Sequence, residues 1–202
     1  MPSCPTVWQA LGMATLRIAQ VPEADRLLSA DPLALLLGML YDQQFPMERA
    51  FAGPYVLAQR LGITSLDATA LAALDPETLT AAMATTPVVH RYPKAMAERT
   101  QAVCHVLVAS YDGSAAALWD TAPTGAELLK RLNALPGFGK QKAQIFVALL
   151  GKQLGVRPPG WEEAAGAYAE DGSFRSVADV TGPEALEKVR AFKKEQKAAA
   201  KA

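Results

Sequence analysis

The chain has 202 residues, half of them hydrophobic, and its 20 basic and 20 acidic side chains give a formal net charge of zero. Such a chain is long enough to bury a hydrophobic core. Because its net charge is zero, the chain as a whole is not basic, and its overall charge gives no indication of a nucleic-acid partner. Two cysteines exclude a disulfide framework. We see neither a membrane-spanning apolar run nor the charged and apolar regions of an export signal, so we expect a cytoplasmic protein.

The first helix signals follow an irregular start. Residues 1–12 fit no helical pattern and are interpreted as an N-terminal extension outside the folded part, and Met13 offers an alternative start. Asp31 and Pro32 are typical of an N-cap and a first helical position. They open the stretch L-A-L-L-L-G-M-L-Y-D, which is apolar nearly all round. This stretch therefore predicts a helix buried at the centre of the core.

Helical periodicity continues through most of the chain. Apolar residues recur at spacings of three and four in six further segments, which are residues 49–61, 66–74, 94–111, 125–134, 140–154 and 184–201. A strand-like alternation is confined to the short L-R-I-A at 16–19. The sequence predicts an all-α protein of about ten short helices.

Charge is distributed unevenly, and the basic part contains a glycine turn. Residues 21–80 carry eight acidic side chains and three arginines, whereas residues 127–157 carry six basic side chains and one glutamate. The turn is L-P-G-F-G-K-Q-K-A at 135–143, where Gly137 and Gly139 permit the positive φ of a short connection between antiparallel helices. The first N–H groups of the second helix stay free to bind an anion. Because Lys140 and Lys142 add positive charge, we expect that anion to be a phosphate.

Three motifs in the same order resemble features of one superfamily. The turn at 135–143 resembles the helix-hairpin-helix element L-P-G-V/I-G-x-x-T-A. The stretch L-L-L-G-M-L-Y-D-Q-Q at 35–44 resembles a buried helix that ends in one or two glutamines, and Y-P-K-A-M-A at 92–97 resembles the start of a central helix. The three together are similar to the base-excision DNA glycosylases of the helix-hairpin-helix (HhH-GPD) superfamily, and closest to its small bacterial branch.

The resemblance implies a two-lobed, HhH-GPD glycosylase-like fold. A six-helix lobe at 31–149, with the helix-hairpin-helix at 125–154, would pack against a second lobe formed by 13–30 and 150–202. A damaged base would flip into the cleft between the lobes, since its glycosidic bond is out of reach inside the stack. The implied partner is double-stranded DNA, bound by a monomer without membrane association.

The resemblance also implies how DNA is held. The backbone N–H groups around Gly137, Gly139 and Gln141 would bind a phosphate, next to Lys140 and Lys142. A monovalent cation, K⁺ or Na⁺, would share the backbone carbonyls of Leu135 and Gly137. Either Gln43 or Gln44 would fill the gap left by the extruded nucleotide.

Two departures from the superfamily limit the expected chemistry. Bifunctional members carry a Schiff-base lysine as the second residue after the second glycine, where this chain has Gln141. An amide forms no imine, so we expect no β-lyase activity. The iron–sulfur branch needs four closely spaced cysteines, and the last cysteine of this chain is Cys104. We therefore expect no iron–sulfur cluster and no other cofactor.

The position of the catalytic carboxylate is a further departure from the superfamily. The superfamily places an aspartate about twenty residues after the hairpin, where this chain has Pro159, and no aspartate occurs between Asp120 and Asp171. Glu162 or Glu163 could supply the carboxylate with a longer side chain. Asp42 could face the cleft instead, with its pKa raised by burial. The third alternative is a cleft without catalysis.

Two aromatic residues are candidates for the base pocket. Trp161 could stack on an extruded base or pack the lobes together, and Tyr41 falls near the presumed cleft by analogy. We therefore expect a monofunctional DNA N-glycosylase that removes a damaged or mispaired base. The alternative is a non-catalytic helix-hairpin-helix protein that binds damaged or distorted duplex DNA.

Overall fold

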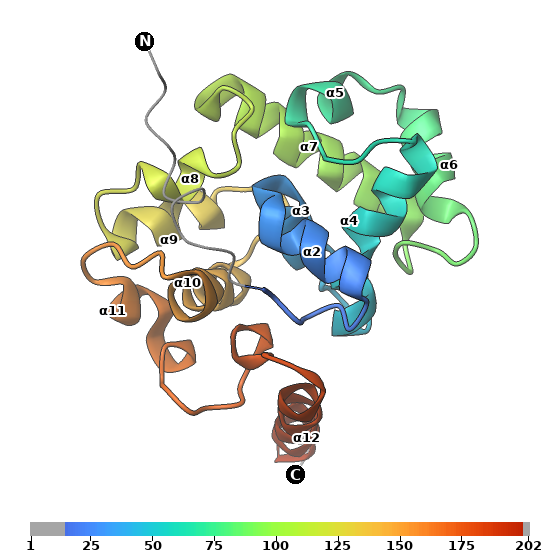
Figure 1. Ribbon diagram of the computed structural model, residues 1–202. Helices are drawn as coiled ribbons and strands as arrows, with labels where there is room; N and C mark the ends of the chain where they lie inside the picture. The colour runs from blue at the N-terminus through green and yellow to red at the C-terminus, as the bar shows by residue number, and fades with distance from the viewer. Residues whose placement is uncertain (1–14, 200–202) are drawn as a thin grey trace.

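The computed structural model describes residues 15–199, which fold entirely into helices and connecting loops (Figure 1). The predicted N-terminal extension at 1–12 and Met13 lie outside this range. Within it there are eleven α-helices, two 3₁₀ helices and no strand, so the all-α class is confirmed and the segment 16–19 is not a strand. None of the helices between residues 15 and 199 has the length and apolar character needed to cross a membrane.

The helices follow one another through short loops. Their bounds are α2 (Pro22–Ala30), α3 (Pro32–Tyr41), α4 (Met47–Leu61), α5 (Ala68–Ala73), α6 (Pro76–Ala84), α7 (Pro93–Tyr111), α8 (Ala117–Asp120), α9 (Gly125–Asn133), α10 (Lys140–Leu154), α11 (Trp161–Ala165), the 3₁₀ helices η1 (Gly166–Tyr168) and η2 (Val177–Asp179), and α12 (Pro183–Ala199). The observed α10 has the predicted bounds of 140–154. The short helices α2, α8 and α11 were not predicted.

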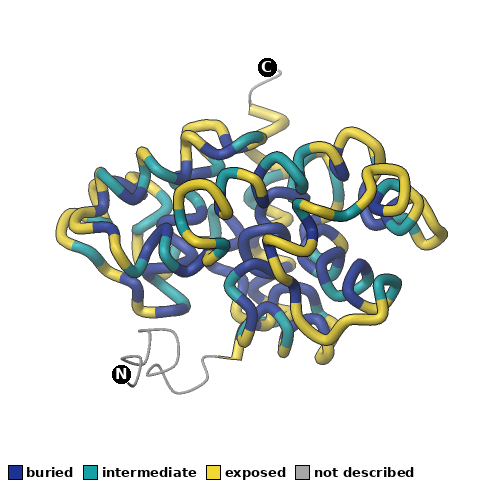
Figure 2. Tube along the Cα trace, turned by 90° about the horizontal axis from the view of Figure 1, so that it is seen from above, coloured by how far each residue is buried: buried dark blue, intermediate teal, exposed yellow. Residues whose placement is uncertain are grey.

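Helix α3 lies at the centre of the molecule, as its apolar sequence predicts. Every residue from Leu33 to Tyr41 is buried. The Asp31 carboxylate caps the helix by accepting hydrogen bonds from the amides of Leu33 and Ala34, and its other oxygen accepts one from the Leu66 amide at 2.7 Å. Figure 2 shows the buried chain segments gathered in the interior, with exposed segments around them.

The helices around α3 share one hydrophobic core. Helices α2 and α4 pack on α3, and α5 and α6 pack along α7. On the other side, α10 packs against α9, α11 and η2. One cluster of buried apolar side chains runs through all of these elements, from Leu16 to Val189. The division into lobes at 31–149 and at both chain ends stays a prediction.

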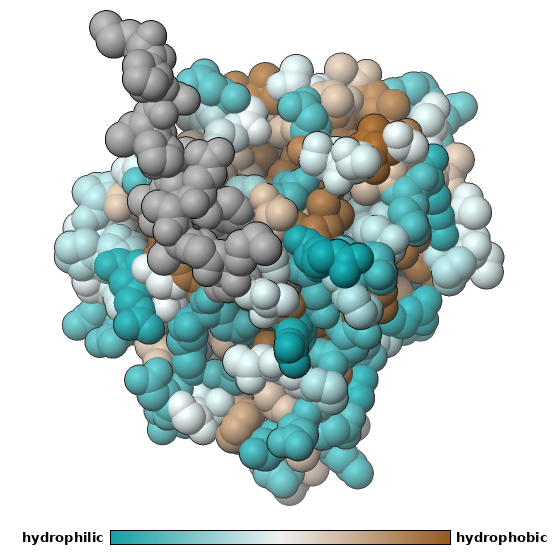
Figure 3. All heavy atoms as spheres, in the orientation of Figure 1, coloured by the Kyte–Doolittle hydropathy of each residue, from teal (hydrophilic) through white to brown (hydrophobic). Residues whose placement is uncertain are grey.

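The C-terminal helix α12 is attached by its first half. Ala185, Leu186 and Val189 are buried, whereas the side chains after Val189 are exposed or half-buried. Helix α12 packs mainly on η2 and lies at the lower edge of the molecule in Figure 1. Hydrophilic residues dominate the surface in that region (Figure 3). The second half of α12 is therefore held by surface contacts.

Candidate functional site

The hairpin at 135–139 is anchored by two apolar side chains. Leu135 and Phe138 are buried, and the Phe138 ring meets Phe146 edge-on with centroids 6.3 Å apart. The Phe138 amide donates to the Leu135 carbonyl at 3.0 Å and closes the turn. Gly137 has a φ of +82°, a conformation that glycine adopts without strain. The expected positive φ is therefore confirmed at Gly137 and is wrong for Gly139, whose φ is −94° because it is the extended N-cap residue of α10.

The exposed side of the hairpin presents unpaired backbone donors. Gly137, Gly139, Lys140 and Gln141 are exposed, and within residues 15–199 their amides donate to no protein acceptor. A Cβ at Gly139 would meet no atom within 4 Å. These unpaired N–H groups lie at the positive end of α10, where an anion is favoured.

The hairpin sits on the last turn of α3. Gly137 packs against the Leu40 side chain, and the Lys142 ammonium donates to the Leu40 carbonyl at 2.8 Å. Asp42 caps the same end of α3, with its amide bonded to the Gly38 carbonyl. Two motifs about one hundred residues apart in sequence are thus neighbours in space.

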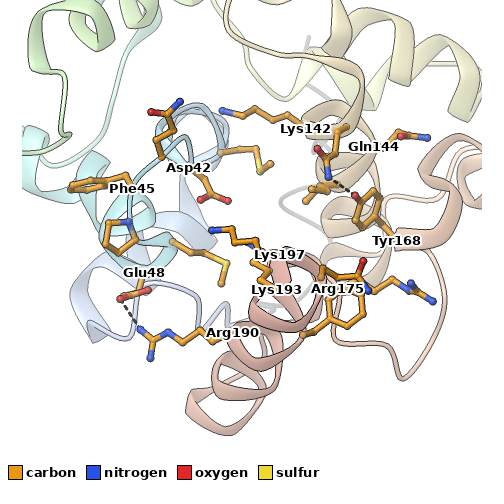
Figure 4. A pocket seen from close by; sticks show the side chains of 18 of the residues that line it. Asp42, Phe45, Glu48, Lys142, Gln144, Tyr168, Arg175, Arg190, Lys193 and Lys197 are labelled. Carbon is orange, nitrogen blue, oxygen red and sulfur yellow. Dashed lines mark hydrogen bonds and ion pairs between the residues drawn. The ribbon is translucent and has the colours of Figure 1, made fainter. Parts of the chain in front are cut away.

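A cleft of about 1300 Å³ opens beside this junction (Figure 4). Its walls come from the α3–α4 loop with the start of α4, from the first turns of α10, from η1 and from the second half of α12. The lining residues are Met39, Asp42, Gln44, Phe45, Pro46, Met47, Glu48, Arg91, Gln141, Lys142, Gln144, Ile145, Ala167, Tyr168, Arg175, Arg190, Phe192, Lys193, Gln196 and Lys197. Arg91 comes from the loop before α7 and Arg175 from the loop between η1 and η2, so segments far apart in the sequence build one site.

The cleft concentrates positive charge in a chain whose net charge is zero. Six basic side chains line it, against two carboxylates, Asp42 and Glu48. The basic residues are Arg91, Lys142, Arg175, Arg190, Lys193 and Lys197. Clefts lined by one sign of charge attract ligands of the opposite sign. The cleft is therefore suited to a polyanion.

Asp42 lies inside this positive surround. Figure 4 shows its carboxylate pointing into the cleft between the α10 and α12 lysines. Within residues 15–199 this carboxylate accepts no hydrogen bond and forms no ion pair within 4 Å. Burial raises its pKa above the usual range, while Lys193 and Lys142 act in the opposite direction. An unpaired carboxylate with a raised pKa in a cleft is a candidate for acid–base chemistry.

Lys142 does not lie at the outer face of the hairpin, where it was expected to bind a phosphate. Its side chain turns into the cleft, where the ammonium lies 5.7 Å from the Phe138 ring centroid and bonds to the Leu40 carbonyl. Burial lowers its pKa to about 8, although Asp42 acts to raise it. Lys140 is exposed beside the unpaired amides as expected. The charge of Lys142 therefore acts on the contents of the cleft.

The two glutamines after α3 have different positions. Gln43 is held by the protein, because its side-chain oxygen accepts from Arg99 at 2.8 Å and its carbonyl bonds His90 Nε2 at 3.0 Å. Gln44 is exposed, lines the cleft and makes no side-chain hydrogen bond within residues 15–199. Its φ of +53° is unusual for a residue other than glycine. Of the two, Gln44 is free to contact a ligand.

Glu162 and Glu163 lie elsewhere. Both are exposed on the first turn of α11, and neither lines the cleft. Acidic residues at the first turn of a helix interact favourably with its dipole. The geometry therefore favours Asp42 over the two glutamates as the carboxylate of this cleft.

The two aromatic candidates for a base pocket belong to the core. Tyr41 is fully buried, its hydroxyl bonds Thr100 at 3.2 Å, and it is not among the residues that line the cleft, so its role in a base pocket stays a prediction. Trp161 packs its ring over Gly151, where any Cβ would collide with it, and Arg157 covers the ring at 5.3 Å. Trp161 lies outside the cleft lining, so its packing role is the correct one of the two.

A metal ion could be held either by side chains or by the backbone carbonyls of the hairpin. Residues 15–199 contain no group of three or more His, Cys, Asp or Glu side chains placed to hold a metal ion. The Leu135 carbonyl accepts the Phe138 amide and keeps one lone pair for a cation, and the Gly137 carbonyl accepts no amide within the described chain. The K⁺ or Na⁺ at these carbonyls remains a prediction.

Sequence reasoning missed part of the cleft lining, namely Arg91, Tyr168 and Arg175. It identified Arg190, Lys193 and Lys197 as part of a basic C-terminal tail, and it favoured a solvated helix end over a phosphate-tracking role for that tail. The one available signal was the spacing of 190, 193 and 197, which places three cations on one helix face. Because lysine-rich helix ends are usually solvated, this spacing carried no indication of a site by itself.

The chain matches no protein-family model, no curated protein and no solved structure. The resemblance to the HhH-GPD superfamily therefore rests on the three sequence motifs alone.

Proposed function

We propose that this protein is a base-excision DNA repair protein, a monofunctional N-glycosylase that removes a damaged or mispaired base from duplex DNA. The observation that carries the proposal is the position of the Asp42 carboxylate, unpaired inside a basic cleft whose lining also includes Gln141 and Lys142 from the end of the hairpin. A duplex bound at the hairpin would place an extruded nucleoside at that cleft.

The roles of the residues follow from their positions. The amides of Gly139 to Gln141 and the side chain of Lys140 would bind a backbone phosphate. Gln44 would occupy the space left in the base stack. Asp42 would stabilise the positive charge that develops on the sugar as the glycosidic bond breaks, or activate the attacking water. Lys193 and Lys142 would favour the charged form of Asp42 against the effect of burial, which raises its pKa.

A non-catalytic duplex-binding protein is the second candidate. One observation favours it: the loop at 155–160, where the superfamily carries its aspartate, has no carboxylate, and Glu162 and Glu163 beyond it face solvent. In this case the basic cleft and the hairpin would bind distorted DNA without breaking a bond.

The two candidates are separated by base release. Duplexes that each carry one damaged or mispaired base are incubated with the protein and then treated with hot alkali, which cleaves at abasic sites. We expect release from at least one substrate, reduced about 10²-fold or more by Asp42→Asn. Glu162→Gln and Glu163→Gln serve as matched controls and should retain release.

The outcomes assign the function directly. Release that survives Asp42→Asn but is lost in Glu162→Gln or Glu163→Gln would contradict the assignment of Asp42. Salt-sensitive duplex binding without release from any substrate would support the non-catalytic candidate. Absence of duplex binding at low salt would contradict both.

A further inference from the structure

Helix α12 presents one basic face to the cleft. Arg190, Lys193 and Lys197 all line it and are spaced three and four residues apart, so they share one side of the helix. Along the helix axis this face spans about 10 Å. It is longer than a single small anion and suits a chain of repeating negative groups.

The cations on this face differ in how they are paired. Arg190 is engaged by two carboxylates, since it contacts Glu187 at 2.6 Å and Glu48 at 2.7 Å. Lys193 and Lys197 have no acidic partner within 4 Å in residues 15–199. Figure 4 shows both side chains directed into the cleft. The charge of these two lysines is therefore available to a ligand.

The paired arginine fixes the helix as a wall of the cleft. Glu48 belongs to the first turn of α4, so its ion pair with Arg190 joins the α4 wall to the α12 wall. Upstream, Leu186 and Val189 hold α12 on the core. Lys193 and Lys197 therefore lie on a helix that is attached to the core through its first half and to α4 through Arg190 at its middle.

We propose that the cleft-facing side of α12 is a second phosphate-binding element for DNA, with Lys193 and Lys197 as its contacts. It holds the backbone of the damaged strand on the wall opposite the α10 hairpin. This inference rests on the proposed DNA binding and extends it from the hairpin to a clamp with two sides. Phosphate contacts of this kind position the strand and carry no base specificity.

The chain offers a matched control on the same helix. Lys188 and Lys194 are exposed and lie outside the cleft lining. The double variant Lys193→Gln/Lys197→Gln and the control Lys188→Gln/Lys194→Gln lose the same charge from the same helix. The first variant loses two charges that line the cleft, and the control loses two charges that lie outside its lining.

The test measures the salt dependence of binding to a duplex that contains one abasic-site analogue, by fluorescence anisotropy over a KCl series. We expect the cleft-facing pair to weaken binding severalfold and to reduce the slope of log K against log salt by about 1.8, or 0.9 for each lost contact. The control pair should leave the slope near that of the unmodified chain. Thermal melting followed by circular dichroism checks that all variants fold.

The outcomes distinguish this inference from the proposed function. Equal effects of the two lysine pairs, with binding still reduced by Lys140→Gln, would overturn the α12 site and leave the hairpin as the DNA contact. If the unmodified chain shows no salt-dependent binding, the proposed function fails and the α12 site fails with it.

Discussion

The ring of His90 is buried and held by a hydrogen bond at each nitrogen. Nδ1 accepts from the Tyr92 amide at 3.1 Å, so Nε2 carries the proton that is donated to the Gln43 carbonyl at 3.0 Å. The Phe45 ring packs against it at 5.1 Å. His90 thereby holds the α3–α4 loop that carries Asp42 and Gln44. Since protonation of Nδ1 would remove the acceptor for the Tyr92 amide, this arrangement requires a neutral imidazole.

We expect stability to fall at mildly acidic pH because of His90. Burial lowers its pKa in the folded chain, so the unfolded chain binds the proton more readily. The contribution is full above the unfolded pKa of about 6.5 and is lost as the pH falls through the folded pKa. Thermal unfolding against pH should show this decline in the unmodified chain and less of it in His90→Gln. His105 is exposed, and the control His105→Gln should keep the decline.

The titration of Asp42 provides a second residue-level prediction, one that does not depend on activity. Burial raises its pKa, and Lys193 is the charge that most strongly lowers it. Carbon-detected NMR of the side-chain carboxylate should therefore show a titration above that of an ordinary aspartate. In Lys193→Gln the titration should move further upward. A titration at or below the ordinary value would mean that the carboxylate is solvated and that the cleft is more open than described.

At the scale of elements, the two glycines of the hairpin have different roles, one in the turn itself and one in ligand binding. Gly137 needs its positive φ, and a Cβ there would lie 2.8 Å from Leu40 Cδ1. Gly139 has a φ of −94° and open space around it. The first glycine is therefore required by the turn, and the second leaves room for a ligand.

Alanine substitutions at these two glycines should differ in their effects on stability and on duplex binding. Gly137→Ala should lower the free energy of unfolding by about 1–2 kcal/mol, the cost of a left-handed conformation for a residue with a Cβ. Gly139→Ala should change it by less than about 0.5 kcal/mol and yet weaken duplex binding, because its methyl group blocks close approach to the amides. Denaturant unfolding and fluorescence anisotropy measure the two effects. Unchanged duplex binding by Gly139→Ala would argue against the hairpin as the DNA contact.

Helices with strong local signals were predictable, and short ones were not. Helix α10 was predicted with its observed bounds because a glycine precedes it and its apolar spacing is regular. Helices α8 and α11 have only 4 and 5 residues, too few for a periodic pattern. The apolar run at 33–41 predicts a buried helix that includes Tyr41, but the partner of its hydroxyl, Thr100, lies 59 residues away and no local pattern indicates it. The lysines of α12 join the cleft through similar long-range packing.

At the scale of the whole molecule, a buried ion pair attaches the C-terminal segment to α10. The Lys152 ammonium contacts Asp179 at 2.5 Å, and their side chains are 12% and 2% exposed. The same ammonium bonds the carbonyls of Tyr168 and Glu170, and Asp179 accepts the amides of Arg175 and Ser176. This network positions Tyr168 and Arg175 in the wall of the cleft.

Removal of one partner should be costly because the other charge stays buried. We expect Lys152→Met to lower the free energy of unfolding by about 3–5 kcal/mol. Arg26→Gln, which removes an exposed pair with Glu23, should cost less than about 1 kcal/mol. Chemical denaturation compares the two variants. A small effect of Lys152→Met would mean that the apolar contacts of the C-terminal segment suffice to hold it.

The left-handed backbone at Gln44 has a consequence for selection at that position. A glycine there would release the strain of a φ of +53° and should make the loop easier to fold. The same exchange would remove an exposed amide side chain that lines the cleft. Folding stability thus favours glycine at position 44, whereas contact with a ligand favours glutamine. The glutamine at this position therefore lowers stability where it gains a possible contact with a ligand.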